Sequence, residues 1–418
     1  MVKYHSNCIN IIKEIVMGTT VVYNVKDYRI PSDPVGDDTP SIQRAINAAI
    51  QSPFPHVGTV YFPSGVYGIY STIVIDTSNG AVIEIVGNGR SSQLRQYFDG
   101  NLFTWNGSCR RQTIRDLKIS PFVPQTLTTL SSYVFFCQFG AEKSIFENIL
   151  IENEAGFNPV NGIFMANPAD STTILNCFFL NMTGVGIRID EGSEVRVIGG
   201  RIGGATGGTH VNDINNRGIF VTGNNGGVHI TDTDLINLYQ GLRIENATGA
   251  GNNREIFVTH ATFDSCYQGL ALLDSCYVSV AGCWAASCSS DNIYVGTNLT
   301  GGATNGPLLV VDGGSIFNAG ANGIADPNNG ANGITINSGS FVLTGIAIRN
   351  NQGRGVWVPS NNNVRKYSIT GCRITDNTNR GVDLVGNGYI CTNNLFSGNG
   401  SSNFFGGANS LTSPNLNI

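Results

Sequence analysis

The sequence predicts an all-β protein in which short parallel strands wind into a solenoid, a parallel β-helix. Three observations lead to this prediction. A glycine followed by apolar residues at alternate positions recurs at intervals of 23 to 32 residues. Segments rich in alternating β-branched residues lie between these copies, and no long stretch after residue 51 has the 3.6-residue period of a helix. Two or three strands per repeat with no intervening helix match a stack of coils.

The N-terminal part contains the one helix that the sequence predicts, residues 39–51. Asp38 or Thr39 can act as its N-cap, and Pro40 stands near the first helical position. We expect this helix to cover the first coil, because an open solenoid end exposes apolar core and unpaired strand edges. The apolar stripe that would face the coil consists of Ile42, Ala45, Ile46, Ala49 and Ile50.

The glycine repeat predicts one strand of every coil from residue 162 onward. Earlier alternating segments, at 82–87, 102–105, 113–119, 133–136 and 144–151, extend the stack toward the N-terminus. Gly, Asn, Asp and Ser between the strands are turn formers that tolerate positive φ. The copies begin at Gly162, Gly186, Gly218, Gly241, Gly269, Asn292, Gly323 (a degenerate copy), Gly355 and Gly381.

These elements divide the chain into three parts. Residues 1–22 form an N-terminal extension, 23–57 contain the capping helix, and 58–418 form the solenoid with a C-terminal closing segment. Residues 1–16 are hypothesised to lie outside the natural protein, because codons for Lys13 and Glu14 can form a ribosome-binding sequence before Met17. No signal peptide or membrane span is predicted. The expected location is therefore the cytoplasm, a virion, or the cell exterior by another route.

Composition excludes several classes of protein. The chain has 24 Lys+Arg and 29 Asp+Glu, and only 13% of its residues are charged. Disorder requires low hydrophobicity and high net charge, and a nucleic-acid-binding surface requires clustered basic residues, so both are excluded. The ten cysteines lack zinc-site spacing and are expected to be buried thiols, with Cys177, Cys283 and Cys372 stacked at equivalent turns. No metal and no cofactor are predicted.

Three N-terminal segments carry a family resemblance. Residues 23–28 (YNVKDY), 36–46 (GDDTPSIQRAI) and 58–67 (GTVYFPSGVY) resemble the pectate-lyase-like superfamily, in the branch with phage tail spikes and related bacterial glycan-active proteins. Residues 32–36 (SDPVG) replace the Gly-Asp-Gly turn that is usual there. The resemblance implies a right-handed β-helix, often a homotrimer, that binds or cuts polysaccharide. It supplies no catalytic residues, and the polygalacturonase motifs Gly-His-Gly and Arg-Ile-Lys are absent from the sequence.

Outward positions of three consecutive repeats give the main candidate site. Alternation places Arg188, Phe220 and Arg243 in one predicted column and Asp190 and Glu245 in the next. The two carboxylates would lie about 9–10 Å apart, two strand spacings. The predicted catalytic pair is Glu245 as general acid and Asp190 as base, with the arginines and Phe220 binding an anionic sugar. The alternative is that these charges form solvated surface pairs.

A second candidate group lies at the turn after the next strand of each coil. Asp232 and Asp234 are alternative catalytic residues there, and His260 on the adjacent coil would bind substrate. An aspartate at a turn usually bonds to its own backbone, which is the structural explanation for this group. Three aromatic residues are equally consistent with a sugar-stacking platform and with turn packing, namely Tyr239, Tyr267 and Trp284.

The predicted function is therefore a glycan-binding β-helix. The sequence favours an enzyme, similar to a glycoside hydrolase or polysaccharide lyase, that hydrolyses, eliminates or rearranges glycosidic bonds. The alternative is a non-catalytic structural or adhesin module, such as a virion spike or capsid decoration protein. Outward apolar residues on one flank, Phe220, Leu273 and Tyr294, predict that three chains pack as a homotrimer.

Overall fold

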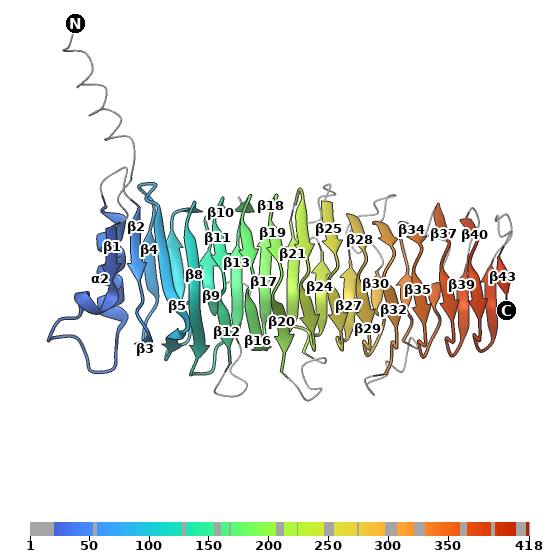
Figure 1. The fold of residues 1–418 in the computed structure, drawn as a ribbon, viewed down its shortest axis with the longest axis horizontal. Helices are drawn as coiled ribbons and strands as arrows, with labels where there is room; N and C mark the ends of the chain where they lie inside the picture. The colour runs from blue at the N-terminus through green and yellow to red at the C-terminus, as the bar shows by residue number, and fades with distance from the viewer. Residues whose placement is uncertain are drawn as a thin grey trace, which may run out of the picture.

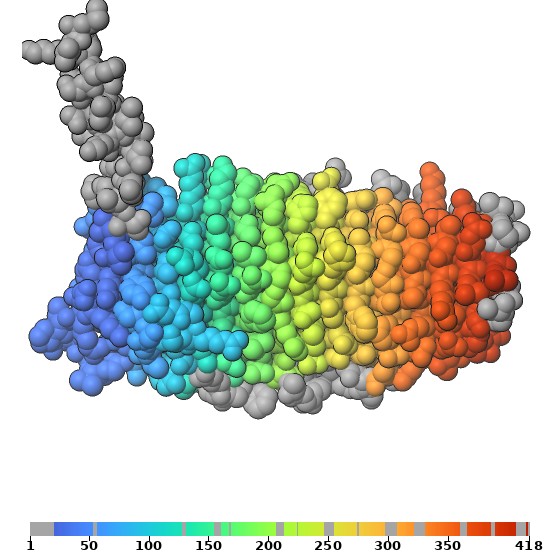
Figure 2. Space-filling view, in the orientation of Figure 1, coloured from blue at the N-terminus to red at the C-terminus, as the bar shows by residue number. Residues whose placement is uncertain are grey.

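The protein folds into a right-handed parallel β-helix, as predicted (Figure 1). Successive coils stack in sequence order, so each coil is one slice of an elongated body (Figure 2). The capping helix lies at one end and the C-terminal strand at the other (Figure 1). The computed structural model describes residues 21–52, 57–127, 131–153, 160–166, 169–205, 213–223, 225–245, 255–273, 276–296, 307–321, 331–359, 366–385, 389–406 and 415–417.

One face of the solenoid is a 13-stranded parallel sheet that carries the glycine repeat. Its strands are β4 (Ile73–Asp76), β6 (Phe103–Asn106), β9 (Tyr133–Cys137), β13 (Asn161–Met165), β17 (Val185–Asp190), β21 (Arg217–Thr222), β24 (Gln240–Ile244), β27 (Gln268–Leu272), β30 (Ile293–Val295), β33 (Ile334–Ile336), β36 (Val356–Val358), β39 (Arg380–Leu384) and β42 (Ser402–Gly406).

The remaining faces belong to a 26-stranded sheet, to which most coils contribute two strands. Its strands are β1 (Val21–Asn24), β2 (Gly58–Tyr61), β3 (Gly65–Ile69), β5 (Ile83–Gln96), β8 (Thr113–Pro121), β11 (Ile145–Glu147), β12 (Leu150–Glu152), β15 (Thr173–Leu175), β16 (Phe178–Met182), β19 (Arg196–Ile198), β20 (Arg201–Gly204), β22 (Val228–Thr231), β23 (Asp234–Ile236), β25 (Glu255–Thr259), β26 (Thr262–Asp264), β28 (Tyr277–Ala281), β29 (Trp284–Ala286), β31 (Leu308–Asp312), β32 (Ser315–Phe317), β34 (Ser340–Thr344), β35 (Ala347–Arg349), β37 (Tyr367–Thr370), β38 (Arg373–Thr375), β40 (Tyr389–Thr392), β41 (Leu395–Ser397) and β43 (Leu416–Asn417). Two short pairs complete the fold, β7 (Cys109–Arg110) with β10 (Ala141–Glu142) and β14 (Ala169–Asp170) with β18 (Gly192–Ser193).

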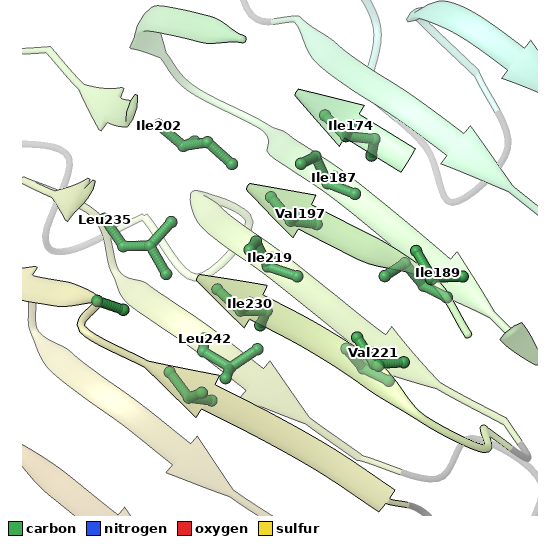
Figure 3. Close-up of a cluster of buried hydrophobic side chains, with 14 of the residues drawn as sticks. Ile174, Ile187, Ile189, Val197, Ile202, Ile219, Val221, Ile230, Leu235 and Leu242 are labelled. Carbon is green, nitrogen blue, oxygen red and sulfur yellow. The ribbon is translucent and has the colours of Figure 1, made fainter. Parts of the chain in front are cut away.

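The core consists of aliphatic side chains stacked from coil to coil (Figure 3). Ile187, Ile219 and Leu242 are register partners on β17, β21 and β24, and all three are buried. Ile174 and Val197 are partners in the same way on β15 and β19. Because inward and outward side chains alternate along a strand, burial of this stack fixes which residues face outward.

The repeated glycine is explained by the close stacking of successive coils at the start of the strands of the 13-stranded sheet. A Cβ atom on Gly218 would lie 2.5 Å from the carbonyl oxygen of Gly241 on the next coil. A Cβ atom on Gly186 would likewise lie 2.7 Å from the Gly218 carbonyl oxygen. Close approach of neighbouring backbones therefore selects glycine at this position.

The capping helix α2 (Thr39–Ile50) follows the short 3₁₀ turn η1 (Val25–Tyr28) and ends one residue before the predicted boundary. Its Gln43 side chain donates to the Val74 carbonyl at 2.7 Å and accepts from the Val74 amide at 2.9 Å, so it pairs with the first strand of the 13-stranded sheet. Asp38 is the N-cap by position, but its carboxylate accepts a hydrogen bond from the Gly68 amide rather than capping the helix.

One predicted repeat differs from the structure. The copy at Gly323 lies outside the described residues, and the strand that pairs with both β30 and β36 is β33, which follows Gly333. Residues 1–16 also lie outside the described part. Nine of the ten cysteines are described, and all nine are buried free thiols. Within the described residues, no helix is long and apolar enough to cross a membrane.

Candidate functional site

Strand register brings the predicted outward residues together on the 13-stranded sheet. Arg188 on β17 pairs with Phe220 on β21, which pairs with Arg243 on β24. Asp190 is opposite Thr222 in the neighbouring column. Because register continues from β9 to β42 of this sheet, one line of outward residues follows the solenoid axis. We call it the outer column: Phe136, Phe164, Arg188, Phe220, Arg243, Ala271, Tyr294, Thr335, Trp357, Asp383 and Phe405.

Phe220 lies beneath three guanidinium groups. The Cζ atoms of Arg217, Arg188 and Arg243 lie 4.8, 5.4 and 6.0 Å from its ring centre. These distances fall within the range of cation–π attraction. Phe220 is consequently only 5% exposed, which corrects the prediction that it contributes an exposed apolar surface to a trimer contact.

Arg217, which the prediction did not include, is the unusual member of this group. Its Nε atom is buried without a hydrogen-bond partner, and the side chain forms no ion pair with a described residue. Burial, followed by the charge of Arg243, lowers the pKa of Arg217 to about 10. The group therefore remains cationic at neutral pH, and an unpaired buried cation is costly unless an anion binds to it.

Asp190 and Arg188 form a bidentate ion pair within β17. Arg188 donates from Nε and Nη2 to the two Asp190 oxygens, each at 2.8 Å. Burial nevertheless raises the pKa of Asp190, against the opposing effect of Arg188. Arg188 also interacts with the Tyr133 hydroxyl, and burial raises the pKa of Tyr133 to about 12. The surroundings of Asp190 thus shift this carboxyl group toward its neutral form.

Glu245 occupies the other end of the group. The Arg243 Nε atom donates to the Glu245 carboxylate at 2.8 Å, and Arg243 Nη1 donates to Gln240 at 2.7 Å. The Glu245 amide donates to the Val221 carbonyl, which continues the register one coil beyond Asp190 and Thr222. The carboxyl groups of Asp190 and Glu245 are therefore separated by two strand spacings, about 9–10 Å.

Seven side chains on four adjacent strands make up what we call the N-terminal arginine cluster: Phe164, Arg188, Asp190, Arg217, Phe220, Arg243 and Glu245. Three cations face two carboxylates, so the cluster has a net positive charge. The Thr222 hydroxyl between the two carboxylates is buried without a hydrogen-bond partner. Arg217, which has no ion pair among the described residues, gives the cluster a cation suited to the carboxylate of an anionic sugar.

The second predicted group lies on a different sheet. His260 Nδ1 is 3.7 Å from Asp232 Oδ1, and both side chains are more than 60% exposed. Both residues have positive φ, at a corner where Asn176 and Gly199 occupy the same place on preceding coils. Asp234 starts β23, opposite Arg201. The backbone geometry of the corner accounts for Asp232 and His260, and the structure does not bring them to the N-terminal arginine cluster.

The three remaining aromatic candidates lie in two different places on the solenoid. Tyr239 and Tyr267 stack on each other, with ring centres 4.8 Å apart and planes 4° from parallel, directly before β24 and β27. They therefore lie beside Gln240 at the margin of the N-terminal arginine cluster. Trp284 lies on β29 of the other sheet, packed edge-on against Phe317. Among the described residues, no three His, Cys, Asp or Glu side chains could hold a metal ion.

Comparisons with known proteins agree with this architecture. The A-module of mannuronan C-5 epimerase AlgE4 from Azotobacter vinelandii is similar with a TM-score of 0.58 and 15% identity, over 94% of this chain and all of that one. The catalytic unit of a GH87 α-1,3-glucanase from Streptomyces thermodiastaticus is similar with a TM-score of 0.51 and 15% identity. The match covers 96% of this chain and 69% of that one. The Dettilon tailspike protein is similar with a TM-score of 0.50 and 14% identity, over 91% of this chain and 68% of that one.

These similarities establish the fold. No curated protein matches the sequence. The family model described as "Rhamnogalacturonase A/epimerase, pectate lyase-like" matches residues 22–251, which are more than half of the 418 residues and include the N-terminal arginine cluster up to Glu245. The chain therefore belongs to the pectate-lyase-like family of rhamnogalacturonase A and epimerases.

Proposed function

We propose that this protein binds an acidic polysaccharide along the outer face of the 13-stranded sheet and cleaves it at the N-terminal arginine cluster. The observation that carries the proposal is Arg217, a partly buried cation whose Nε atom has no partner and which lies between Arg188 and Arg243. A uronate carboxylate would satisfy it with charge-assisted hydrogen bonds. Family membership and the similarity to a mannuronan C-5 epimerase support this class of ligand.

For the cleavage step we assign Asp190 as general acid and Glu245 as general base. Burial raises the pKa of Asp190 against the opposing effect of Arg188, which makes Asp190 the better candidate to donate a proton to the leaving oxygen. Glu245 would take a proton from the attacking water. This reverses the roles expected from sequence. The separation of about 9–10 Å is near the upper end of the ~6.5–9.5 Å typical of inverting glycosidases.

The second candidate is a non-catalytic binding module. Its support is that each carboxylate is held by an arginine of its own strand, Asp190 by Arg188 and Glu245 by Arg243. Such pairs can simply hold the arginines in place for a ligand. Both candidate functions require the same anionic ligand. They differ in that only the enzyme would cleave the polysaccharide and release new reducing ends.

Calorimetric titration with polygalacturonate, alginate and neutral dextran tests the binding. We expect both acidic polymers to bind more tightly than dextran, and Arg217→Gln to weaken that binding about 10- to 100-fold, as expected for loss of a hydrogen bond to a charged group. Arg196→Gln is the matched control, because Arg196 pairs with Glu194 on the other sheet. Equal binding of dextran, or unchanged binding by Arg217→Gln, would overturn the proposal. A reducing-end assay on the bound polymer then separates the two candidates.

We also propose that the chain assembles as a homotrimer. Because Phe220 is buried, it cannot form the contact between subunits. The surface that supports a trimer lies on the 26-stranded sheet, where Tyr277 and Leu308 are register partners and both more than one third exposed. Adjacent exposed apolar side chains favour burial between subunits. Light scattering should give three times the chain mass, and a monomer mass at micromolar concentration would refute the assembly.

A further inference from the structure

A second group of arginines and aromatic rings lies on the same sheet, toward the C-terminus. Arg354 and Arg380 both donate to Asp383, at 2.6 and 2.8 Å. Their Cζ atoms lie 4.6 Å from the ring centre of Trp357 and 4.2 Å from that of Phe405. We call these five residues the C-terminal arginine cluster. Two cations share one carboxylate, so this cluster also has a net positive charge.

The two clusters are built from the same short sequence. Arg217-Gly-Ile-Phe220 begins β21 and Arg354-Gly-Val-Trp357 leads into β36, so each arginine lies three residues before an aromatic member of the outer column. The shared glycine allows close approach of the next coil, because a Cβ atom on Gly355 would lie 2.4 Å from the Gly381 carbonyl oxygen. Both arginines therefore stand at the same place on their coils, over a ring at 4.8 and 4.6 Å.

The fold itself does not require charges at these positions. On the strands between the clusters, β27, β30 and β33, the outer column contains Ala271, Tyr294 and Thr335. The coils stack there without an arginine–carboxylate pair in the outer column. A buried carboxylate shared by two arginines carries a desolvation cost that packing alone could avoid. The C-terminal arginine cluster is therefore better explained by binding than by stability.

Between the clusters, polar side chains of adjacent coils are buried and pair with each other. Gln240 and Gln268 are hydrogen-bonded to each other at 2.8 Å on β24 and β27. Asp291 and Asn332 are joined at 3.1 Å on the following coils. From β21 to β36 the sheet advances by five strand spacings, about 24 Å. This distance is long enough for several sugar rings of an extended chain.

We infer that the C-terminal arginine cluster is a second anionic subsite, and that one acidic polysaccharide chain lies along the solenoid axis across both clusters. The inference rests on the proposed function, since it assigns a further part of the same ligand. In this arrangement Arg354 and Arg380 bind a carboxylate several sugars away from the one at Arg217, while Trp357 and Phe405 pack against sugar rings.

Titration with oligogalacturonates of increasing length tests the inference. For the wild type, affinity should rise about tenfold or more once the chain is long enough to span both clusters, because the second contact is then intramolecular. Arg354→Gln should abolish that rise and leave the affinity of short oligomers for the N-terminal arginine cluster unchanged. Arg373→Gln, on β38 of the other sheet, is the matched control and should behave as wild type. Unchanged melting temperatures establish that the variants are folded.

The outcomes separate this inference from the function on which it rests. One outcome is that short oligomers bind, that Arg217→Gln weakens their binding, and that Arg354→Gln binds long oligomers as tightly as wild type does. The second subsite is then refuted and the proposed function stands. If no oligomer or polymer of galacturonate or alginate binds to the wild type, both are refuted. Equal proportional loss in Arg354→Gln for short and long oligomers also contradicts the inference, because the variant would then not have removed the gain that comes from spanning both clusters.

Discussion

The N-terminal arginine cluster and the corner formed by Asp232 and His260 both place acidic and basic side chains on adjacent coils. In the cluster, the ion-paired side chains of Arg188 and Asp190 are 11% and 25% exposed. At the corner, the exposed fractions of His260 and Asp232 are 66% and 63%, and both residues have positive φ. Backbone geometry explains the residues of the corner, whereas nothing in the β-helix scaffold requires the charges of the cluster. Burial of charge is therefore the better guide to function here.

The largest expected effect is on catalysis. Asp190→Asn removes the proposed acid and should lower the rate of polysaccharide cleavage by about 10²- to 10⁴-fold, the contribution of a positioned acid or base. Asp232→Asn makes the same chemical change at the corner and should retain full activity. Reducing-end assays measure both. If Asp190→Asn retains full activity on a polymer that the wild type cleaves, Asp190 is not the general acid.

The next effect concerns the backbone under the cluster. Gly218→Ala would place a Cβ atom 2.5 Å from the Gly241 carbonyl oxygen, so we expect a loss of about 2–4 kcal/mol in the free energy of unfolding. Gly226→Ala is the control, since its Cβ atom would meet only the Ser193 hydroxyl at 3.9 Å. Urea denaturation of both variants gives the comparison, and equal stability would show that the coils can separate without cost.

A smaller effect is the pH dependence of stability. Because burial raises the pKa of Asp190, the folded state holds this proton more tightly than the unfolded chain does. This contribution is complete below the unfolded value of about 3.9 and is lost as pH rises through the folded value. The unfolding free energy of Asp190→Asn minus that of wild type should therefore increase with pH over this window. Denaturation between pH 3 and 7 measures it, and a difference that falls with pH would contradict the assignment.

The smallest effect should appear at the corner. His260→Gly relieves a left-handed conformation that costs an L-residue about 1–2 kcal/mol, while glycine adds unfolded-state entropy, so a net gain of at most about 1 kcal/mol is expected. His229→Gly, in β22 and stacked on Phe257, should instead lose stability. Thermal melts distinguish the two. A loss of glycan binding in His260→Gly would restore the corner as a functional site.

The sequence predicts the scaffold well because alternation and glycine spacing are local properties. The capping helix, the stacked coils and the pairing of Arg188, Phe220 and Arg243 were all deducible from these patterns. The missed coil strand β33 follows Gly333, where the sequence has a better copy of the repeat than at Gly323.

The site was only partly predictable. Burial of Phe220 depends on guanidinium groups from three strands, and the pKa of Asp190 depends on the same surroundings. Neither follows from the residues of one strand. Arg217 had a usable signal, because an arginine immediately before the repeat glycine recurs at Arg354 and Arg380.

The two hydrogen bonds between Gln43 and Val74 have a consequence for aggregation. The outer edge of a terminal β-strand presents free amide and carbonyl groups, which can template another chain and start end-to-end filament growth. Gln43 satisfies both backbone groups of Val74, and the buried face of α2 covers the apolar interior beside it. The helix therefore blocks end-to-end growth at this end of the solenoid, a direction different from the side-by-side packing proposed for the trimer.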